Sequence, residues 1–283
     1  MTQAADYLAI SQQIENLLVR KNLRGMATLQ PHLRPGYILR AARLINQCRG
    51  TVLIGTGFPV LDTFETDGPV GAIGLYQLLK AVGADPVIVS GNPLYSQLQT
   101  EYRCYPLKVN QYDALPDIAA AALAELKPQL VISIERPGFN AQQRYCNMRG
   151  EDISERCASF DYFLTLAACP TIGIGDGGNE IGMGNLYQQV SQLNIVPAVT
   201  PCDELIVADV SNWAAWGIAA MVSVLRGEDL LKTADPLAIL QYLSARGSVD
   251  GVTRLNTLTE DGLAHTEGEQ LIADLKALIK STV

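Results

Sequence analysis

Four short and almost uninterrupted apolar runs, separated by segments with helical periodicity, limit the folds open to this chain. The runs are TVLIGT, PVIVS, LVISI and LIVAD, at residues 51–56, 86–90, 130–134 and 205–209. A continuous apolar pattern is typical of strands that are buried on both faces, as in parallel sheets covered by helices. The sequence therefore predicts an α/β protein, with a mostly parallel sheet, helices on both faces and a Rossmann-like three-layer architecture.

The segments around these runs carry apolar residues at helical spacing. We expect a helical N-terminal lead-in over 1–50, a core sheet with ligand loops over 51–228 and C-terminal helices over 229–283, in a single α/β domain spanning 1–283. Individual helices are expected near 6–20, 36–48, 69–82, 115–126, 153–168, 211–225, 236–245 and 267–280, with a short strand at 170–174 and a small turn or hairpin at 249–258.

Composition excludes several classes of function. The chain has 283 residues, of which 48% are hydrophobic and 18% charged, so it can bury a full core. Its 29 acidic and 21 basic residues include no basic cluster, which argues against a nucleic-acid partner. The longest apolar stretch, 213–225, is too short to span a membrane. With six scattered cysteines and no signal-peptide pattern, we expect a cytoplasmic protein with reduced thiols, whether monomer or homo-oligomer.

The sequence also excludes the common histidine-based chemistries. His32 and His265 are the two histidines of the chain, and neither lies in a motif. A Ser-His-Asp triad and a His-rich zinc site are therefore not expected. Glycine-rich phosphate loops ending in Gly-Lys-Ser/Thr, GxSxG elbows and HExxH motifs are absent. The chemistry that remains uses carboxylates, guanidinium groups, amides and backbone N–H groups.

Ligands of open α/β sheets bind beyond the carboxyl ends of the strands, and three polar loops occupy that position here. The first is GTGFPVLDTFETDGPVG at residues 55–71. It leads into a helix N-terminus, which favours an anion by about 0.3–1 kcal/mol. Thr56 and Gly57 are candidate substrate contacts, and Glu65 and Asp67 are candidate catalytic carboxylates. Capping of the helix that follows is the alternative role for Asp67.

The second loop, ERPGFNAQQRYCNMRGED at 135–152, carries three arginines in an acidic protein. Arginine binds carboxylates through two parallel hydrogen bonds, so Arg136 and Arg149, together with Asn147, are candidate substrate contacts. A solvated surface loop with local ion pairs is the alternative. Cys146 lies in this loop without an adjacent histidine, and we expect a spectator thiol rather than a nucleophile.

The third loop, TIGIGDGGNEIGMGN at 171–185, has six glycines in fifteen residues. Such a density indicates sharp turns or a close approach of the backbone to a ligand. Asp176 and Glu180 are candidate catalytic carboxylates, and Gly177, Gly178 and Asn179 are candidate substrate contacts. The same oxygen-rich set suits Mg²⁺ or Mn²⁺, with Asp176 and Glu180 as the metal ligands, so the use of a metal stays open.

Four motifs in these loops resemble the D-glutamate cyclase-like C-terminal domain family. They are ETDGPVGA at 65–72, ERPG at 135–138, YCNMRGEDI at 145–153 and GIGDGGNEIGMGN at 173–185. The resemblance runs from about residue 35 to residue 282 in a standalone form of the domain. It implies an α/β domain and a lyase that converts D-glutamate, an acidic amino acid, to 5-oxo-D-proline with loss of water.

Such a cyclisation requires a deprotonated amine, an activated γ-carboxyl group and a folded substrate. We expect Asp176 or Glu180 to be the base, and Glu65 or Asp67 to be the acid or a metal ligand in the same role. Arg136 or Arg149 would bind the α-carboxylate, and backbone N–H groups of residues 177–178 would stabilise the oxyanion. Lactam hydrolysis, racemisation of a related substrate and binding of a small anion without catalysis are the alternatives.

Overall fold

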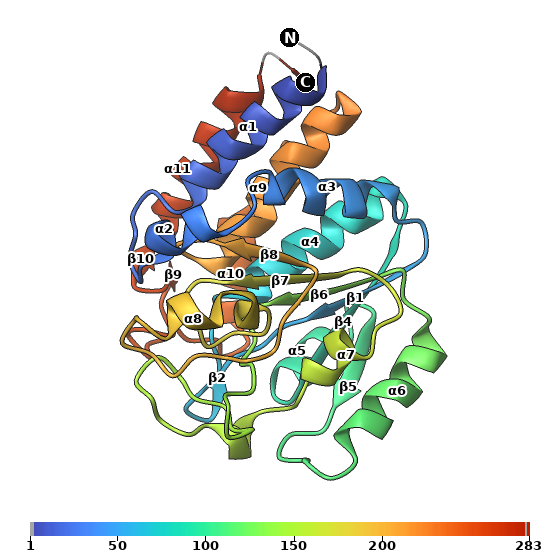
Figure 1. Ribbon diagram of the computed structural model, residues 1–283, viewed down its shortest axis with the longest axis vertical. Helices are drawn as coiled ribbons and strands as arrows, with labels where there is room; N and C mark the ends of the chain where they lie inside the picture. The colour runs from blue at the N-terminus through green and yellow to red at the C-terminus, as the bar shows by residue number, and fades with distance from the viewer. Residues whose placement is uncertain (1–2, 281) are drawn as a thin grey trace.

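A six-stranded parallel sheet forms the centre of the computed structural model, which describes residues 3–280 and 282–283 (Figure 1). The strand order is β5-β4-β1-β6-β7-β8, and each neighbouring pair is parallel. The six strands are β1 (Thr51–Gly55), β4 (Asp85–Gly91), β5 (Cys104–Leu107), β6 (Leu130–Ile134), β7 (Thr171–Gly175) and β8 (Glu204–Val207). This is the doubly wound order of Rossmann-like folds, and the predicted fold class is confirmed.

Side chains of the strands alternate between two apolar cores, one on each face of the sheet. On one face, Val52 and Ile54 of β1 pack in a core with α3 (Tyr37–Gln47), α4 (Pro69–Val82) and α9 (Ser211–Arg226). On the other face, Leu53 packs with α6 (Leu115–Leu126) and α7 (Asp161–Thr165). Burial on both faces explains why the strands read as unbroken apolar runs.

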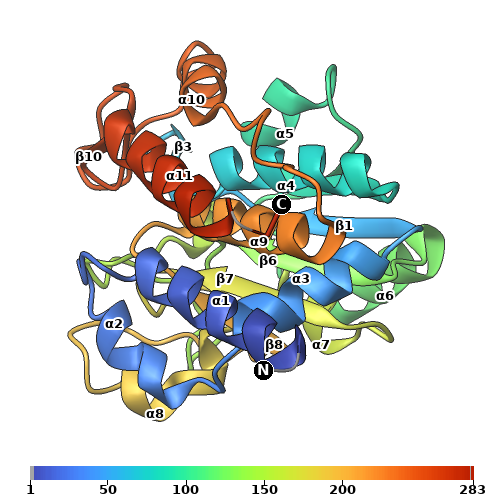
Figure 2. The same ribbon diagram turned by 90° about the horizontal axis from the view of Figure 1, so that it is seen from above.

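The two ends of the chain pack against one buried helix. Helix α9 is buried along almost its whole length, and α1 (Gln3–Leu18) and α11 (His265–Ile279) lie against its outer side (Figure 2). A Cβ atom at Gly217 would lie 3.1 Å from the side chains of Ile14 and Leu18, so glycine at this position lets α1 approach closely. The helical lead-in is therefore part of the folded core.

Smaller elements complete the chain, and several were not expected. The short helices are α2 (Met26–Leu29), α5 (Leu94–Leu98), α8 (Tyr187–Val190) and α10 (Pro236–Ser244), with 3-10 turns at Gln30–His32, Ser154–Arg156 and Met183–Leu186. Two-residue strands form the hairpins β2 (Pro59–Val60) with β3 (Thr63–Phe64), and β9 (Thr259–Glu260) with β10 (Leu263–Ala264). No helix within the described residues is long and apolar enough to cross a membrane.

One local prediction needs correction, and another is confirmed. The helix expected over 153–168 is a 3-10 turn followed by the short α7, because residues 157–160 join two buried clusters without forming a helix. The turn expected over 249–258 is present: the Asp250 carboxylate accepts the N–H groups of Val252 and Thr253, and the β9–β10 hairpin lies directly after it.

Candidate functional site

Two neighbouring cavities lie where the loops after β1, β6 and β7 meet. The larger has a volume of about 370 Å³ and the smaller about 220 Å³, and both are lined by Phe58, Pro59, Leu61 and Arg156. Strands β1 and β6 are adjacent in the sheet although the chain visits β4 and β5 between them. This is the topological switch point at which ligands bind in such folds. The three loops selected from the sequence do converge there.

The larger cavity collects acidic side chains from the three loops and from two further segments. Glu65 follows β3, Glu135 follows β6 and Asp176 follows β7, and all three are buried and line the cavity. Arg24, from the connection between α1 and α2, and Asp261, from the β9–β10 turn, line it as well. Sequence reasoning missed these last two. The Asp-Gly dipeptide at 261–262 is a hairpin signal that could have placed Asp261 at a turn.

Arg24 links the lead-in to this cluster. Its guanidinium group pairs with the carboxylates of both Asp176 and Asp261, and its Nε donates to the main-chain oxygen of Asp176 at 3.3 Å. The Asp209 carboxylate holds the same connection, accepting the N–H groups of Lys21 at 2.6 Å and Leu23 at 3.2 Å. Asp209 therefore fixes the chain segment that positions Arg24.

Asp67 caps a helix, but not the one next to it in sequence. Its carboxylate accepts the N–H groups of Ser211 and Asn212 at the start of α9, each at 2.8 Å. Asn212 caps α4 in the same way: its Oδ1 accepts the N–H groups of Gly68 at 2.8 Å and Gly71 at 2.6 Å at the start of that helix. Each helix thus caps the other, and both N-termini are fixed at the inner end of the site.

The cluster carries more carboxylates than cations. Burial, reinforced by neighbouring carboxylates, raises the pKa values of Glu65, Asp67, Glu135 and Asp176 well above those of exposed acids. Burial also raises the pKa of Glu260 to about 7. Asp261 differs: burial opposes its ionisation, but the Arg24 charge and the hydrogen bonds with Asp176, Arg24 and Asp67 together lower its pKa. The cluster therefore combines carboxyl groups whose pKa values are raised with one whose pKa is lowered, an arrangement that suits acid–base chemistry.

The carboxylates that could hold a metal differ from the expected pair. Oxygens of Asp67, Glu135 and Asp176 lie within 4.8 Å of one another, a grouping compatible with a divalent cation. Glu180 is buried away from both cavities, and its carboxylate accepts the N–H groups of Gly177 at 2.8 Å and Gly178 at 2.7 Å. These N–H groups, expected to stabilise an oxyanion, instead shape the glycine-rich loop around Glu180.

Guanidinium groups lie toward the rim of the larger cavity. Arg149 donates to the main-chain oxygen of Val252 at 3.1 Å, and Arg156 donates to that of Leu61 at 2.7 Å. Among the described residues, neither arginine has a carboxylate within ion-pair distance. Asn147 lines the cavity and accepts the Arg149 N–H at 2.9 Å, so it shapes the loop that presents this arginine. The cavity thus has acids inside and unpaired cations near its opening.

Other candidates from the sequence have different surroundings. Asn179 lines the larger cavity, and its Nδ2 donates to the Cys146 main-chain oxygen at 2.9 Å, while its buried Oδ1 has no partner among the described residues. Arg144 pairs with Asp152 at 3.6 Å on the surface, which matches the surface alternative for that part of the loop. Burial raises the pKa of the Cys146 thiol, which argues against a reactive thiolate.

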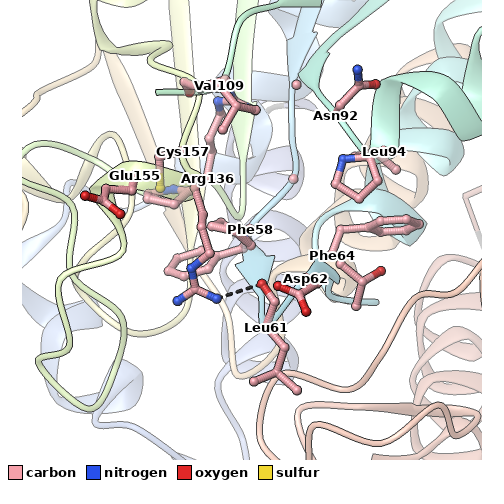
Figure 3. Close-up of a pocket in the computed structure, with 18 residues that line it drawn as sticks. Phe58, Leu61, Asp62, Phe64, Asn92, Leu94, Val109, Arg136, Glu155 and Cys157 are labelled. Atoms are coloured by element: carbon pink, nitrogen blue, oxygen red, sulfur yellow. Dashed lines mark hydrogen bonds between the residues drawn. The ribbon is translucent and has the colours of Figure 1, made fainter. Parts of the chain in front are cut away.

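Arg136 lines the smaller cavity rather than the one with the acids (Figure 3), and so does Gly57. Arg136 is buried and donates to the main-chain oxygens of Thr56 and Ala158. Thr56 lines neither cavity, and its buried hydroxyl finds no hydrogen-bond partner in the part of the chain that the structure describes. The substrate contacts expected from the sequence are therefore divided between two adjacent cavities.

Comparison with known proteins places the chain in a family. The family model described as "D-glutamate cyclase-like, C-terminal" matches residues 14–276. A human protein named D-glutamate cyclase, mitochondrial, is 28% identical over 218 residues, which are 66% of this chain and 35% of that protein. The chain thus spans about a third of this relative's length. In a solved structure, an exopolyphosphatase-related protein from Bacteroides fragilis aligns with a TM-score of 0.43 at 9% identity, over 88% of this chain and 62% of that chain.

The family model extends over most of the chain, from α1 to α11, and includes every loop of the larger cavity. The resemblance found in the loop motifs is thus confirmed and extended into the lead-in that carries Arg24. This chain belongs to the D-glutamate cyclase-like, C-terminal family.

Proposed function

We propose that this protein is a lyase that cyclises D-glutamate to 5-oxo-D-proline with loss of water. Membership of the family and the relationship to the human D-glutamate cyclase support the reaction class. One observation carries the proposal: the larger cavity has buried carboxylates inside and unpaired guanidinium groups toward its opening. An amino acid carries an ammonium group and a carboxylate, so it complements both ends of this cavity.

The raised and lowered pKa values of the acids inside the cavity support an acid–base mechanism. Asp176 and Asp261 flank the Arg24 guanidinium, and the pair titrates as one unit that accepts the proton of the substrate ammonium. Glu65, whose pKa is raised by burial and by neighbouring carboxylates, is the proton donor to the departing oxygen. The amine nitrogen then attacks the γ-carboxyl carbon, a C–N bond forms, a C–O bond breaks and water leaves.

Recognition of the α-carboxylate is assigned to Arg149. This arginine lines the same cavity as the acids, whereas Arg136 lines the neighbouring cavity. Glu180 has no assigned contact with the substrate, since both of its oxygens accept backbone N–H groups of its own loop.

A divalent cation is the alternative means of activating the γ-carboxyl group. Asp67, Glu135 and Asp176 would hold it, and it would polarise the carboxyl group as a Lewis acid. Most of these oxygens already accept protein hydrogen bonds, for example from Ser211 Oγ to Glu135 at 2.6 Å. Protonation is therefore the primary proposal.

The test is chiral chromatography after incubation of the protein with D-glutamate, L-glutamate and both 5-oxoprolines, each with Mg²⁺, Mn²⁺ or EDTA. Formation of 5-oxo-D-proline from D-glutamate alone, undiminished by EDTA, is the expected result. Loss of turnover in EDTA would indicate that a metal ion, and not protonation, activates the γ-carboxyl group. Glutamate formed from 5-oxoproline would instead indicate a lactam hydrolase, and the opposite enantiomer a racemase. Thermal stabilisation by glutamate without any product would indicate a binding protein and contradict the proposal.

A further inference from the structure

The smaller cavity plays no part in the dehydration proposed above. Its lining is largely apolar and comes from the β2–β3 hairpin, the loop after β4 and the segment after the 3-10 turn at Ser154–Arg156 (Figure 3). The apolar residues that the argument uses are Phe58, Leu61, Phe64, Leu94 and Val109. A cavity of about 220 Å³ with such a lining favours an apolar group of the size of a side chain.

A buried cation lies in the wall of this largely apolar cavity, whose two carboxylates, Asp62 and Glu155, are exposed. Arg136 is 2% exposed, and its hydrogen-bond partners are the main-chain oxygens of Thr56 and Ala158. Its Nε has no partner, and no carboxylate of the described residues forms an ion pair with it. The Phe160 ring, 5.4 Å from the Arg136 Cζ, is a weak substitute for an anion. Buried charges are normally paired, so an anionic ligand would supply the missing partner.

The two cavities adjoin one another. Phe58, Pro59, Leu61 and Arg156 line both, so this short wall separates the buried acids from Arg136. A ligand that crosses the wall would place an amino-acid head among the acids, an apolar group in the smaller cavity and a second anionic group beside Arg136.

Together these features specify a substrate larger than free glutamate. Resting on the proposed function, we propose that the enzyme also acts on D-glutamate whose γ-carboxyl group forms an amide with an apolar amino acid. The glutamyl part occupies the larger cavity. The amino acid that leaves occupies the smaller cavity, with its carboxylate facing Arg136.

The same groups carry out the reaction on this substrate. The amine nitrogen attacks the γ-carbonyl carbon, the lactam C–N bond forms and the amide C–N bond breaks. The Asp176–Asp261 pair takes the amine proton, and Glu65 donates a proton to the leaving nitrogen. The products are 5-oxo-D-proline and the free amino acid, with no water consumed or released. An uncharged amide carbonyl is also a better electrophile than an ionised carboxylate.

The substrate side of the test requires no change to the protein. Release of 5-oxo-D-proline is measured from D-glutamate, γ-D-glutamyl-L-leucine and γ-D-glutamyl-L-leucinamide, which lacks the terminal carboxylate. We expect kcat/KM for the dipeptide to exceed that for D-glutamate at least tenfold, and the leucinamide to fall at least tenfold below the dipeptide. Equal rates for the dipeptide and the leucinamide would overturn the pairing with Arg136.

The two proposals fail in different ways. Turnover of D-glutamate without turnover of the dipeptide would overturn this inference and leave the proposed function in place. Turnover of the dipeptide alone would support this inference and overturn the dehydration. No product from any of the three substrates, with a protein that unfolds cooperatively, would overturn both.

A variant of the cavity wall completes the test. Val109 is partly buried and lines the smaller cavity but not the larger. We expect Val109→Trp to fill the smaller cavity, to lower kcat/KM for the dipeptide at least tenfold and to leave D-glutamate turnover within twofold. Val199→Trp is the matched control, because Val199 is 39% exposed and lines neither cavity. An equal loss on both substrates, or no loss on the dipeptide, would contradict the proposal.

Discussion

The two cavities lie side by side at one edge of the sheet, yet their buried charges differ in sign. In the larger, buried carboxylates outnumber the cation Arg24 that pairs with them. In the smaller, the buried cation Arg136 has no ion pair among the described residues, and the two carboxylates of the lining, Asp62 and Glu155, are exposed. Because each imbalance would be costly if left uncompensated, each indicates a ligand or a proton that the folded protein takes up. The comparison therefore assigns proton transfer to one cavity and binding of an anion to the other.

The largest expected effect is on catalysis in the acidic cavity. Glu65→Gln removes the proposed proton donor while keeping its shape, and we expect kcat for D-glutamate to fall about 10²–10⁴-fold. Steady-state formation of 5-oxo-D-proline measures it. Glu155→Gln is the matched control, since Glu155 is exposed and lines the other cavity. Near wild-type turnover in Glu65→Gln would remove Glu65 from the mechanism.

The second expected effect is on stability and concerns Arg24, the cation of the acidic cavity. Arg24→Met leaves Asp176 and Asp261 without their cation, and we expect the free energy of unfolding to fall by about 3–5 kcal/mol. Urea denaturation at pH 7 measures this change. Arg254→Met is the control, because its exposed pair with Glu151 is worth about 0–1 kcal/mol. An Arg24→Met protein as stable as the control would show that the cluster does not depend on this pairing.

The third prediction concerns pH. The pKa of Glu260 is raised to about 7 by burial, so the unfolded chain ionises this group at lower pH than the folded protein does. Its contribution to stability is complete below about pH 4.5 and is lost as the pH rises through 7. Glu260→Gln stays neutral, so we expect it to match the wild type at pH 4.5 and to exceed it by up to about 3 kcal/mol at pH 8. Urea midpoints across this range, unchanged relative to the wild type, would contradict the shifted pKa.

The smallest effect is expected in the smaller cavity. Arg136→Met removes two hydrogen bonds to main-chain oxygens but also removes an unpaired buried charge, so the two changes oppose each other. We expect the free energy of unfolding to change by about 1–2 kcal/mol, less than for Arg24→Met. The same urea titration measures both. A loss as large as that of Arg24→Met would mean that Arg136 is a structural residue and not a ligand for an anion.

Much of the fold could be predicted from local sequence patterns. The apolar runs placed β1 and β6 within a residue of their ends, and Pro69 and Gly83 bracket α4 as start and stop signals. The helix predicted after Ile153 was wrong because the backbone there depends on contacts with distant residues. One of these is the hydrogen bond from the Thr200 hydroxyl to Asp161. Strand β5 was missed because its residues are only partly buried and its apolar run is short.

The site could be predicted only in part. The three loops were identifiable because glycines, acids and arginines follow buried strands, and parallel strands carry such loops to one edge. Arg24 and Asp261 gave weaker signals, since each lies in a connection between helices or short strands. Their roles arise when α1 and α11 pack against α9, which brings residues more than 200 positions apart into one ion pair.

The sequence by itself determined most strands of the sheet, the long helices, their order along the chain and the acidic and guanidinium groups at the sheet edge. Apolar periodicity and glycine positions are local patterns of a few residues, so the elements they favour can be recognised without knowing the tertiary contacts. The tertiary structure decided how those groups are divided: Asp67 caps α9, Glu180 binds its own loop, and Arg136 lines a separate cavity from Arg149. Partners, burial and pKa shifts depend on contacts between distant segments, and only the packed molecule creates those contacts.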